Sequence, residues 1–246
     1  MSNIGLVMTT SIRNYLRLKT ALFIMATVTI ICVAGVALIF CILLLEPEIE
    51  KAAPDRSLLE SYMGIVVYAT SFIVVGITLS SFAFQSLVRE KTRGNLQALL
   101  ATPFRASDIW IGKSLSIFLP GAALGIVTAV LVLIILNAVY TLPETGFLFN
   151  IWIVISSFIA VPLIYLALGL LVHLIGLTSK AANGNLLAQM FLPVMINVMI
   201  QLTVRNVVAA GSWLFAVMNI GLAVVIGIIV LSVRSKLTPE NIILSN

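Results

Sequence analysis

Residues 21–45 of the chain read ALFIMATVTIICVAGVALIFCILLL, and no charged side chain interrupts this stretch of 25 residues. A helix needs about 20 predominantly apolar residues to cross the hydrocarbon core of a bilayer, so the stretch is long enough for one membrane span. Five later stretches have the same character. The predicted spans cover residues 21–45, 61–86, 112–137, 150–175, 186–204 and 211–233.

The composition of the whole chain indicates a membrane protein as well. Of its 246 residues, 61% are hydrophobic and 9% are charged, and the mean hydropathy is +1.18. Soluble domains carry about 25% charged residues, so this composition excludes a soluble globular enzyme and a disordered chain. We therefore expect residues 1–246 to form a single all-α membrane domain with six transmembrane helices in the lipid bilayer.

The basic residues between the spans indicate how the chain lies in the membrane. Six spans place both termini on one side, and 11 of the 14 Lys and Arg residues fall on that side. Because basic residues next to spans stay in the cytoplasm, both termini are predicted to be cytoplasmic. The net charge of +5 is explained by this topology, and we expect no nucleic-acid partner.

Residues 3–19, ahead of the first span, form a candidate surface helix. Apolar residues alternate there with polar ones, and Arg13, Arg17 and Lys19 lie close to the membrane entry. This pattern is typical of an N-terminal amphipathic helix at the membrane interface. The alternative is a frayed chain start with a basic anchor. The apolar positions are Ile4, Leu6, Val7, Ile12, Leu16 and Leu18.

Residues 86–113 form the longest predicted cytoplasmic connection, and they contain a short helical pattern. Asn95 can cap the start of a helix, the leucines that follow lie at helical spacing, and Thr102-Pro103 would end it. So short a helix is unstable by itself, so its leucines need lipid headgroups, the body of this protein or a groove in another protein. The alternative is an elbow helix that only turns the chain.

This segment also carries a resemblance to a known family. The run 90–103, EKTRGNLQALLATP, followed by Gly112-Lys113, resembles the membrane (permease) subunits of ABC transporters of the type-2 export family. Such subunits have six spans, a cytoplasmic amphipathic N-terminal helix and this loop between spans two and three. The resemblance thus covers the whole topology, and the motif itself covers about 25 residues. Asn95 departs from the small hydroxylated residue of many relatives but still permits capping.

The resemblance implies that the short helix is a cytoplasmic coupling helix, which docks in a groove of a separate ABC ATPase subunit. It also implies a second permease copy, as a homodimer or with a close paralogue, because six spans make half a pathway. The location would be a plasma (inner) membrane. The residues expected to couple the chain to the ATPase are Glu90, Gly94, Asn95, Leu96, Leu99, Leu100, Thr102 and Pro103.

The chain itself carries no sign of a catalytic site. Gly112-Lys113-Ser114 is the nearest approach to a phosphate-binding loop, but it lacks the earlier glycine, since residue 107 is serine. We expect no catalytic residue, cofactor or metal on this chain, with ATP and Mg²⁺ bound by the partner ATPase. Two transport alternatives stay open: a haem-export-type subunit for cytochrome assembly, and a transporter driven by an ion gradient.

Four polar or helix-breaking residues follow one another in the fifth span at intervals of four: Gln189, Pro193, Asn197 and Gln201. Such a stripe turns by only about 40° per step around a helix. Polar residues at membrane depth are functional candidates, so we expect this edge to line the translocation pathway or the seam between two copies. The alternative is hydrogen bonding between helices of one protomer.

Two further features of the spans are expected to have structural roles. His173 is the only histidine, and we expect it to make a structural hydrogen bond rather than to bind a ligand. Gly121-x-x-x-Gly125 lets helices approach closely, and we expect this contact to lie within the protomer.

Overall fold

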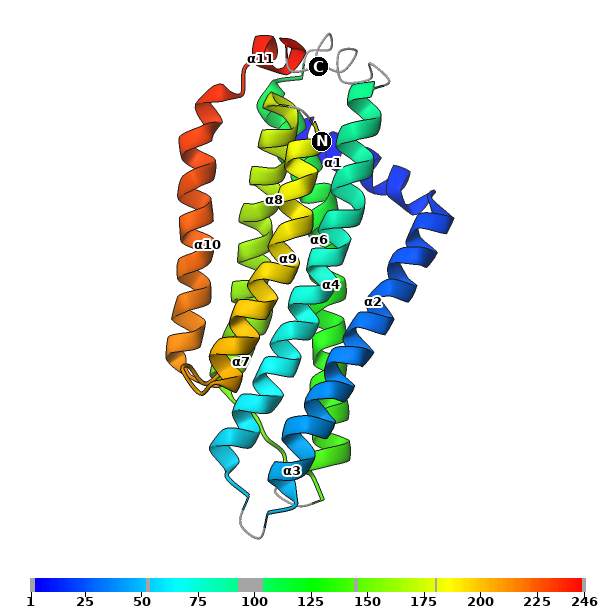
Figure 1. The fold of residues 1–246 in the computed structure, drawn as a ribbon. Helices are drawn as coiled ribbons and strands as arrows, with labels where there is room; N and C mark the ends of the chain where they lie inside the picture. The colour runs from blue at the N-terminus through cyan, green and yellow to red at the C-terminus, as the bar shows by residue number, and fades with distance from the viewer. Residues whose placement is uncertain (1–2, 52–53, 93–103, 144–145, 180, 245–246) are drawn as a thin grey trace.

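The computed structural model describes residues 3–51, 54–92, 104–143, 146–179 and 181–244. All elements within these ranges are helices, and six stretches are long and apolar enough to cross a membrane (Figure 1). These findings confirm the predicted all-α class and the number of spans, and they support a multi-pass membrane protein. Both termini lie at the same end of the bundle, as six spans require; the side of the membrane that this end faces stays a prediction.

Several spans are built from more than one helical element. In chain order the elements are α1 (Asn3–Leu16), α2 (Lys19–Phe40), η1 (Cys41–Leu45), α3 (Glu46–Ile49), α4 (Arg56–Thr92), α6 (Ala106–Leu136), η2 (Asn137–Thr141), α7 (Ile151–Val154), η3 (Ile155–Ala160), α8 (Val161–Thr178), α9 (Ala181–Val204), α10 (Trp213–Val233), η4 (Arg234–Lys236) and α11 (Pro239–Leu244). The elements η1, η2 and η3 are π-helical turns that continue an α-helix within a span.

The spanning stretches overlap the predicted spans one by one. They are Lys19–Ile49, Arg56–Phe82, Ala106–Thr141, Ile151–Thr178, Ala182–Val204 and Trp213–Lys236. The largest difference is at the start of the third, which begins at Ala106 rather than at residue 112. The reason is that Asp108 and Lys113, whose charges suggested the edge of the span, belong to the helix itself.

Helix α4 forms the centre of the bundle. It packs against α2, α6, α8 and α9, and Figure 1 shows it between α2 and α9. Its stretch Arg56–Phe82 is the most buried of the spans, yet its mean hydropathy of 2.0 is below the 3.1 of the largely exposed first span. This is expected in a bilayer, where lipid-facing surfaces must be apolar while the protein interior can hold hydrogen-bonded polar groups.

The α4 side chains in the core are aromatic and polar. Tyr68 and Phe72 are fully buried, and the Tyr68 hydroxyl donates a hydrogen bond of 2.6 Å to Oδ1 of Asn219 on α10. The Tyr68 ring also meets Phe215 edge to face, with 5.0 Å between the ring centroids. These contacts attach α10 to the central helix, because the buried hydroxyl of Tyr68 and the buried amide of Asn219 supply each other with a hydrogen-bond partner.

Two glycines of α6 allow it to lie close to α4. A Cβ atom at Gly125 would lie 2.5 Å from Cγ2 of Val75, and one at Gly121 would lie 3.1 Å from Cγ2 of Thr78. Both neighbours belong to α4, so the predicted packing role of Gly121-x-x-x-Gly125 within the protomer is confirmed.

The chain start forms a helix, α1, that packs against the beginning of α6. Val7 is buried there, and a Cβ atom at Gly112 would lie 2.9 Å from the Cβ of Val7. Tyr15 is buried against Phe82 of α4, with ring centroids 5.1 Å apart. Part of the apolar side of α1 therefore contacts the protein, while its amphipathic role at the membrane interface stays a prediction.

We predict that Gly125→Ala destabilises the bundle by about 1–3 kcal/mol, because the new methyl group overlaps the stiff side chain of Val75. Gly35→Ala is the matched control, since nothing lies within 4 Å of a Cβ atom at Gly35. Thermal unfolding in detergent measures both variants. Equal stability of the two would contradict the close α4–α6 contact.

Candidate functional site

The predicted coupling segment lies for the most part outside the described residues. This applies to seven of its members: Gly94, Asn95, Leu96, Leu99, Leu100, Thr102 and Pro103. Glu90 belongs to the last turn of α4, which continues to Thr92. Helix α4 ends at Thr92, at the end of the bundle that holds the termini (Figure 1).

The second predicted site, the polar edge of α9, faces away from the bundle. Gln189, Pro193, Asn197 and Gln201 are all exposed. The opposite side of the helix is the buried one, and its members Gly184, Ala188, Met199 and Thr203 recur with the same helical spacing. The predicted grouping on one helix edge is thus observed, and this edge is part of the protomer surface.

Hydrogen bonding within the protomer uses little of this edge. Gln201 accepts a bond of 3.1 Å from Nε of Arg205, one turn further along the chain. In the described part of the chain, neither Gln189 nor Asn197 has a hydrogen bond to a neighbouring helix. The amides at membrane depth therefore remain available to a partner outside the protomer.

Among the other five spans, the more buried ones generally have the lower mean hydropathy. Helix α9 does not follow this trend. Its mean hydropathy of 1.7 is the lowest of the six spans, and it is also the least buried. A helix with this surface would expose its amides to hydrocarbon, which is unfavourable. The polar content of α9 is therefore not explained by the interior of one protomer.

The position of α9 is fixed by tight contacts on its buried side. Phe191 lies 6.1 Å from Phe72 of α4 and 6.1 Å from Tyr165 of α8, measured between ring centroids. A Cβ atom at Gly184 would lie 2.5 Å from the carbonyl oxygen of Val172 on α8. These contacts fix how α9 is rotated about its own axis. In this orientation the polar edge faces outward.

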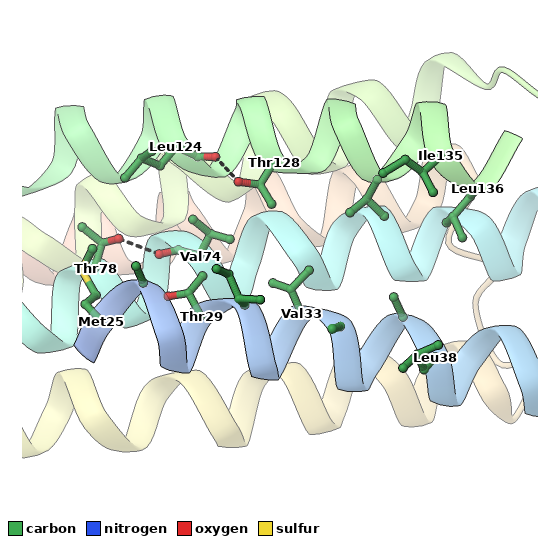
Figure 2. Close-up of a pocket in the computed structure, with 15 residues that line it drawn as sticks. Met25, Thr29, Val33, Leu38, Val74, Thr78, Leu124, Thr128, Ile135 and Leu136 are labelled. Atoms are coloured by element: carbon green, nitrogen blue, oxygen red, sulfur yellow. Dashed lines mark hydrogen bonds between the residues drawn. The ribbon is translucent and has the colours of Figure 1, made fainter. Parts of the chain in front are cut away.

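An apolar groove lies on the other side of α4, between α2, α4 and α6 (Figure 2). It has a volume of about 600 Å³. Its threonines Thr78 and Thr128 donate to backbone carbonyls of their own helices, at Val74 and Leu124, with distances of 2.8 and 2.7 Å. Thr29 of α2 is the third threonine in the lining, and the other twelve lining residues are apolar, so the groove offers a largely hydrocarbon surface.

Two ionisable residues are buried in the half of the bundle near the termini. Lys113 on α6 is 2% exposed, and His173 on α8 is fully buried. Nδ1 of His173 lies 2.8 Å from the carbonyl oxygen of Gly169, which confirms the predicted structural hydrogen bond. The burial of Lys113 was not predicted, because a lysine at the edge of an apolar run normally extends to the membrane surface.

At the end opposite the termini, Asn150 joins three parts of the chain. Its Oδ1 caps α7 by accepting from the amide of Trp152 at 2.9 Å. Its Nδ2 donates to Oε2 of Glu60 at 2.9 Å and to the carbonyl oxygen of Gly211 at 3.0 Å. This cluster connects α4, α7 and the turn before α10, and it closes that end of the protomer.

We predict that Asn150→Ala lowers the free energy of unfolding by about 1–2 kcal/mol, because it removes the cap and leaves partly buried hydrogen-bonding groups without this partner. The control is Glu50→Ala, an exposed residue at the same end. Chemical denaturation in detergent measures the difference. If both variants matched the unmodified chain, Asn150 would not hold this end together.

No family model, curated protein or solved structure matches the chain. Its function is therefore inferred from its own residues and their arrangement.

Proposed function

We propose that the chain is the permease subunit of an ATP-binding cassette exporter. Two copies form the translocation pathway between them, and a separate cytoplasmic ATPase supplies the energy. The observation that carries this proposal is the exposed polar edge of α9, formed by Gln189, Pro193, Asn197 and Gln201.

The physical reason for a second copy is the unfavourable exposure of amides to lipid. An amide in an apolar medium without a hydrogen bond costs about 2 kcal/mol or more. Asn197 lies mid-helix in α9, four residues before Gln201 and its bond to Arg205, so its amide faces hydrocarbon in a single protomer. In a two-fold dimer the same edge of each copy meets its equivalent, which gives the amides partners or a hydrated path.

The connection to an ATPase is supported by the end of the bundle that carries the termini. Helix α4 continues to Thr92 at this end, and the coupling-like motif 90–103 begins in its last turn. Three leucines of this motif, Leu96, Leu99 and Leu100, lie outside the described residues, and their helical spacing in the sequence predicts an apolar edge suited to a groove of a partner. The chain lacks a phosphate-binding loop of its own, so the partner would bind ATP and Mg²⁺.

A transporter driven by an ion gradient is a second candidate, and one observation favours it. Ionisable residues inside spans often belong to ion or proton pathways. Lys113 and His173 are two buried ionisable residues of this kind. In this alternative the chain would work without an ATPase. The presence or absence of an ATPase partner therefore distinguishes the two candidate functions.

The seam between two copies is tested by cross-linking. In a background with Cys32→Ser and Cys41→Ser, we predict that Asn197→Cys forms a disulfide-linked dimer in native membranes after mild oxidation, because equivalent residues of a two-fold interface meet. Val225→Cys is the matched control, since Val225 is 54% exposed on α10, away from α9. Gel electrophoresis without reductant measures the dimer. Equal cross-linking at both positions would contradict a seam along α9.

The coupling role is tested by co-purification. We predict that Leu96→Asp combined with Leu99→Asp abolishes association with a Walker-type ATPase in gentle detergent, because charges would enter an apolar groove. Ser235→Asp adds a negative charge at an exposed position of the same end and should leave association intact. Mass spectrometry of the purified complex identifies the partner. A chain that purifies alone from every membrane mimic would favour the gradient-driven alternative.

A further inference from the structure

A second apolar groove lies on the other flank of the protomer, between α6, α8 and α10. It has a volume of about 710 Å³ and lies beside α10, at the edge of the bundle in Figure 1. Along α10 it runs from Ile220 to Arg234, which corresponds to about 21 Å of helix. The hydrocarbon of one leaflet is about 15 Å thick, so the groove spans the depth of a leaflet.

Gly227 of α10 lines the groove and contributes no side chain to its wall. A Cβ atom at Gly227 would have no neighbour within 4 Å, so the space beside this residue is open. Apart from Arg234 the rest of the lining is apolar, with bulky walls from residues such as Leu170 on α8 and Ile228 on α10. Such a volume does not stay empty in a membrane, because its walls would lose their van der Waals contacts.

One end of the groove is polar and positively charged. Arg234, directly after α10, lines this end and is exposed. No acidic side chain lines the groove, and in the described part of the chain Arg234 forms no ion pair. Trp110, which begins the α6 wall, donates its indole N–H to the carbonyl oxygen of Leu170 at 2.8 Å, so its ring is held as part of the lining.

We propose that this groove binds one anionic phospholipid of the surrounding bilayer. Its acyl chain lies along Gly227 between α8 and α10, and its phosphate meets the guanidinium of Arg234. Arginine matches a phosphate with two parallel hydrogen bonds, and basic pockets between spans are typical sites for anionic headgroups. This inference depends only on the position of the chain in a membrane, and it is independent of the proposed transport function.

Charge complementarity favours a lipid over a helix of another protein as the occupant. The only charge in the lining lies at the end of the groove, at the depth of the headgroups, while the remaining length offers hydrocarbon. Ala223 and Gly227 lie four residues apart on α10, a spacing that would also admit a partner helix, so the preference for a lipid depends on the cation at the headgroup end, which has no ion pair in the described part of the chain. Polar side chains that would bond a partner helix lie on α9, as exposed amides, and not in this groove.

The test uses fluorescence quenching by brominated lipids. Of the three tryptophans, Trp152 and Trp213 lie at the end opposite the termini, and replacing both by Phe leaves Trp110 as the only reporter. The purified full chain is reconstituted in phosphatidylcholine vesicles that contain a minor fraction of either brominated phosphatidylglycerol or brominated phosphatidylcholine. We expect phosphatidylglycerol to bind beside Trp110 about fivefold better, the effect of one basic residue at a membrane surface.

Two pairs of variants separate the headgroup from the acyl chain. Arg234→Gln should bring the preference for phosphatidylglycerol to about one, while Arg17→Gln, which removes a charge at the same end but away from the groove, should preserve it. Gly227→Leu should fill the groove and lower quenching by both lipids. Gly221→Leu is its matched control, because Gly221 also has open space around its Cβ but does not line the groove.

Several outcomes would overturn the proposal. Equal quenching by the two lipids in the parent chain would remove the anionic preference. Equal effects of Gly227→Leu and Gly221→Leu would show that the groove is not the binding place. Absence of quenching by either lipid, together with release of a co-purified chain by Gly227→Leu, would assign the groove to a protein partner. If Gly227→Leu fails to fold, the comparison of Arg234→Gln with Arg17→Gln still decides.

Discussion

The burial of α4 among its neighbours is the constraint on which the rest of the structure depends. In a bilayer the apolar surface of a helix gives little drive for association, so close packing and satisfied polar groups must hold the spans together. The glycines of α6 permit this packing, and the Tyr68–Asn219 hydrogen bond attaches α10. Once α4 is enclosed, the outward faces of the other spans are determined, and these are the faces that meet lipid or partners.

The fold could be predicted from the sequence because hydrophobic length and the positions of charges suffice to find spans. Which way each side chain points could not be predicted with the same means. The spacing of Gln189, Pro193, Asn197 and Gln201 placed them on one edge of a helix, but only the packing of Phe191 and Gly184 shows that this edge faces outward. Lys113 was treated as a surface charge, and its burial depends on how α6 meets α8. The coupling motif lies largely outside the described residues, so the reading of Leu96 and its neighbours still depends on the sequence resemblance.

The exposed faces of α9 and α10 have opposite chemistry although both lie on the surface. The α9 face carries amides within a span, which favours a protein or aqueous neighbour. The α10 face is hydrocarbon with a single cation at its end, which favours lipid. The protomer thus has a side suited to assembly and a side suited to the bilayer, and the two are separated by the bundle core.

The π-helical turns η1 and η3 lie between helical segments within two of the stretches described above, and η2 ends a third. A π-turn accommodates one residue more than the α-helical turn it replaces, while the helices on either side keep their positions. Loss of a single residue within such a turn would therefore convert it to an α-turn without shifting the contacts of α8 or α6. Over evolutionary time, relatives of this chain can gain or lose a residue at these three places and still conserve the same bundle, so gaps in an alignment of their spans would mark π-turns rather than changes of fold.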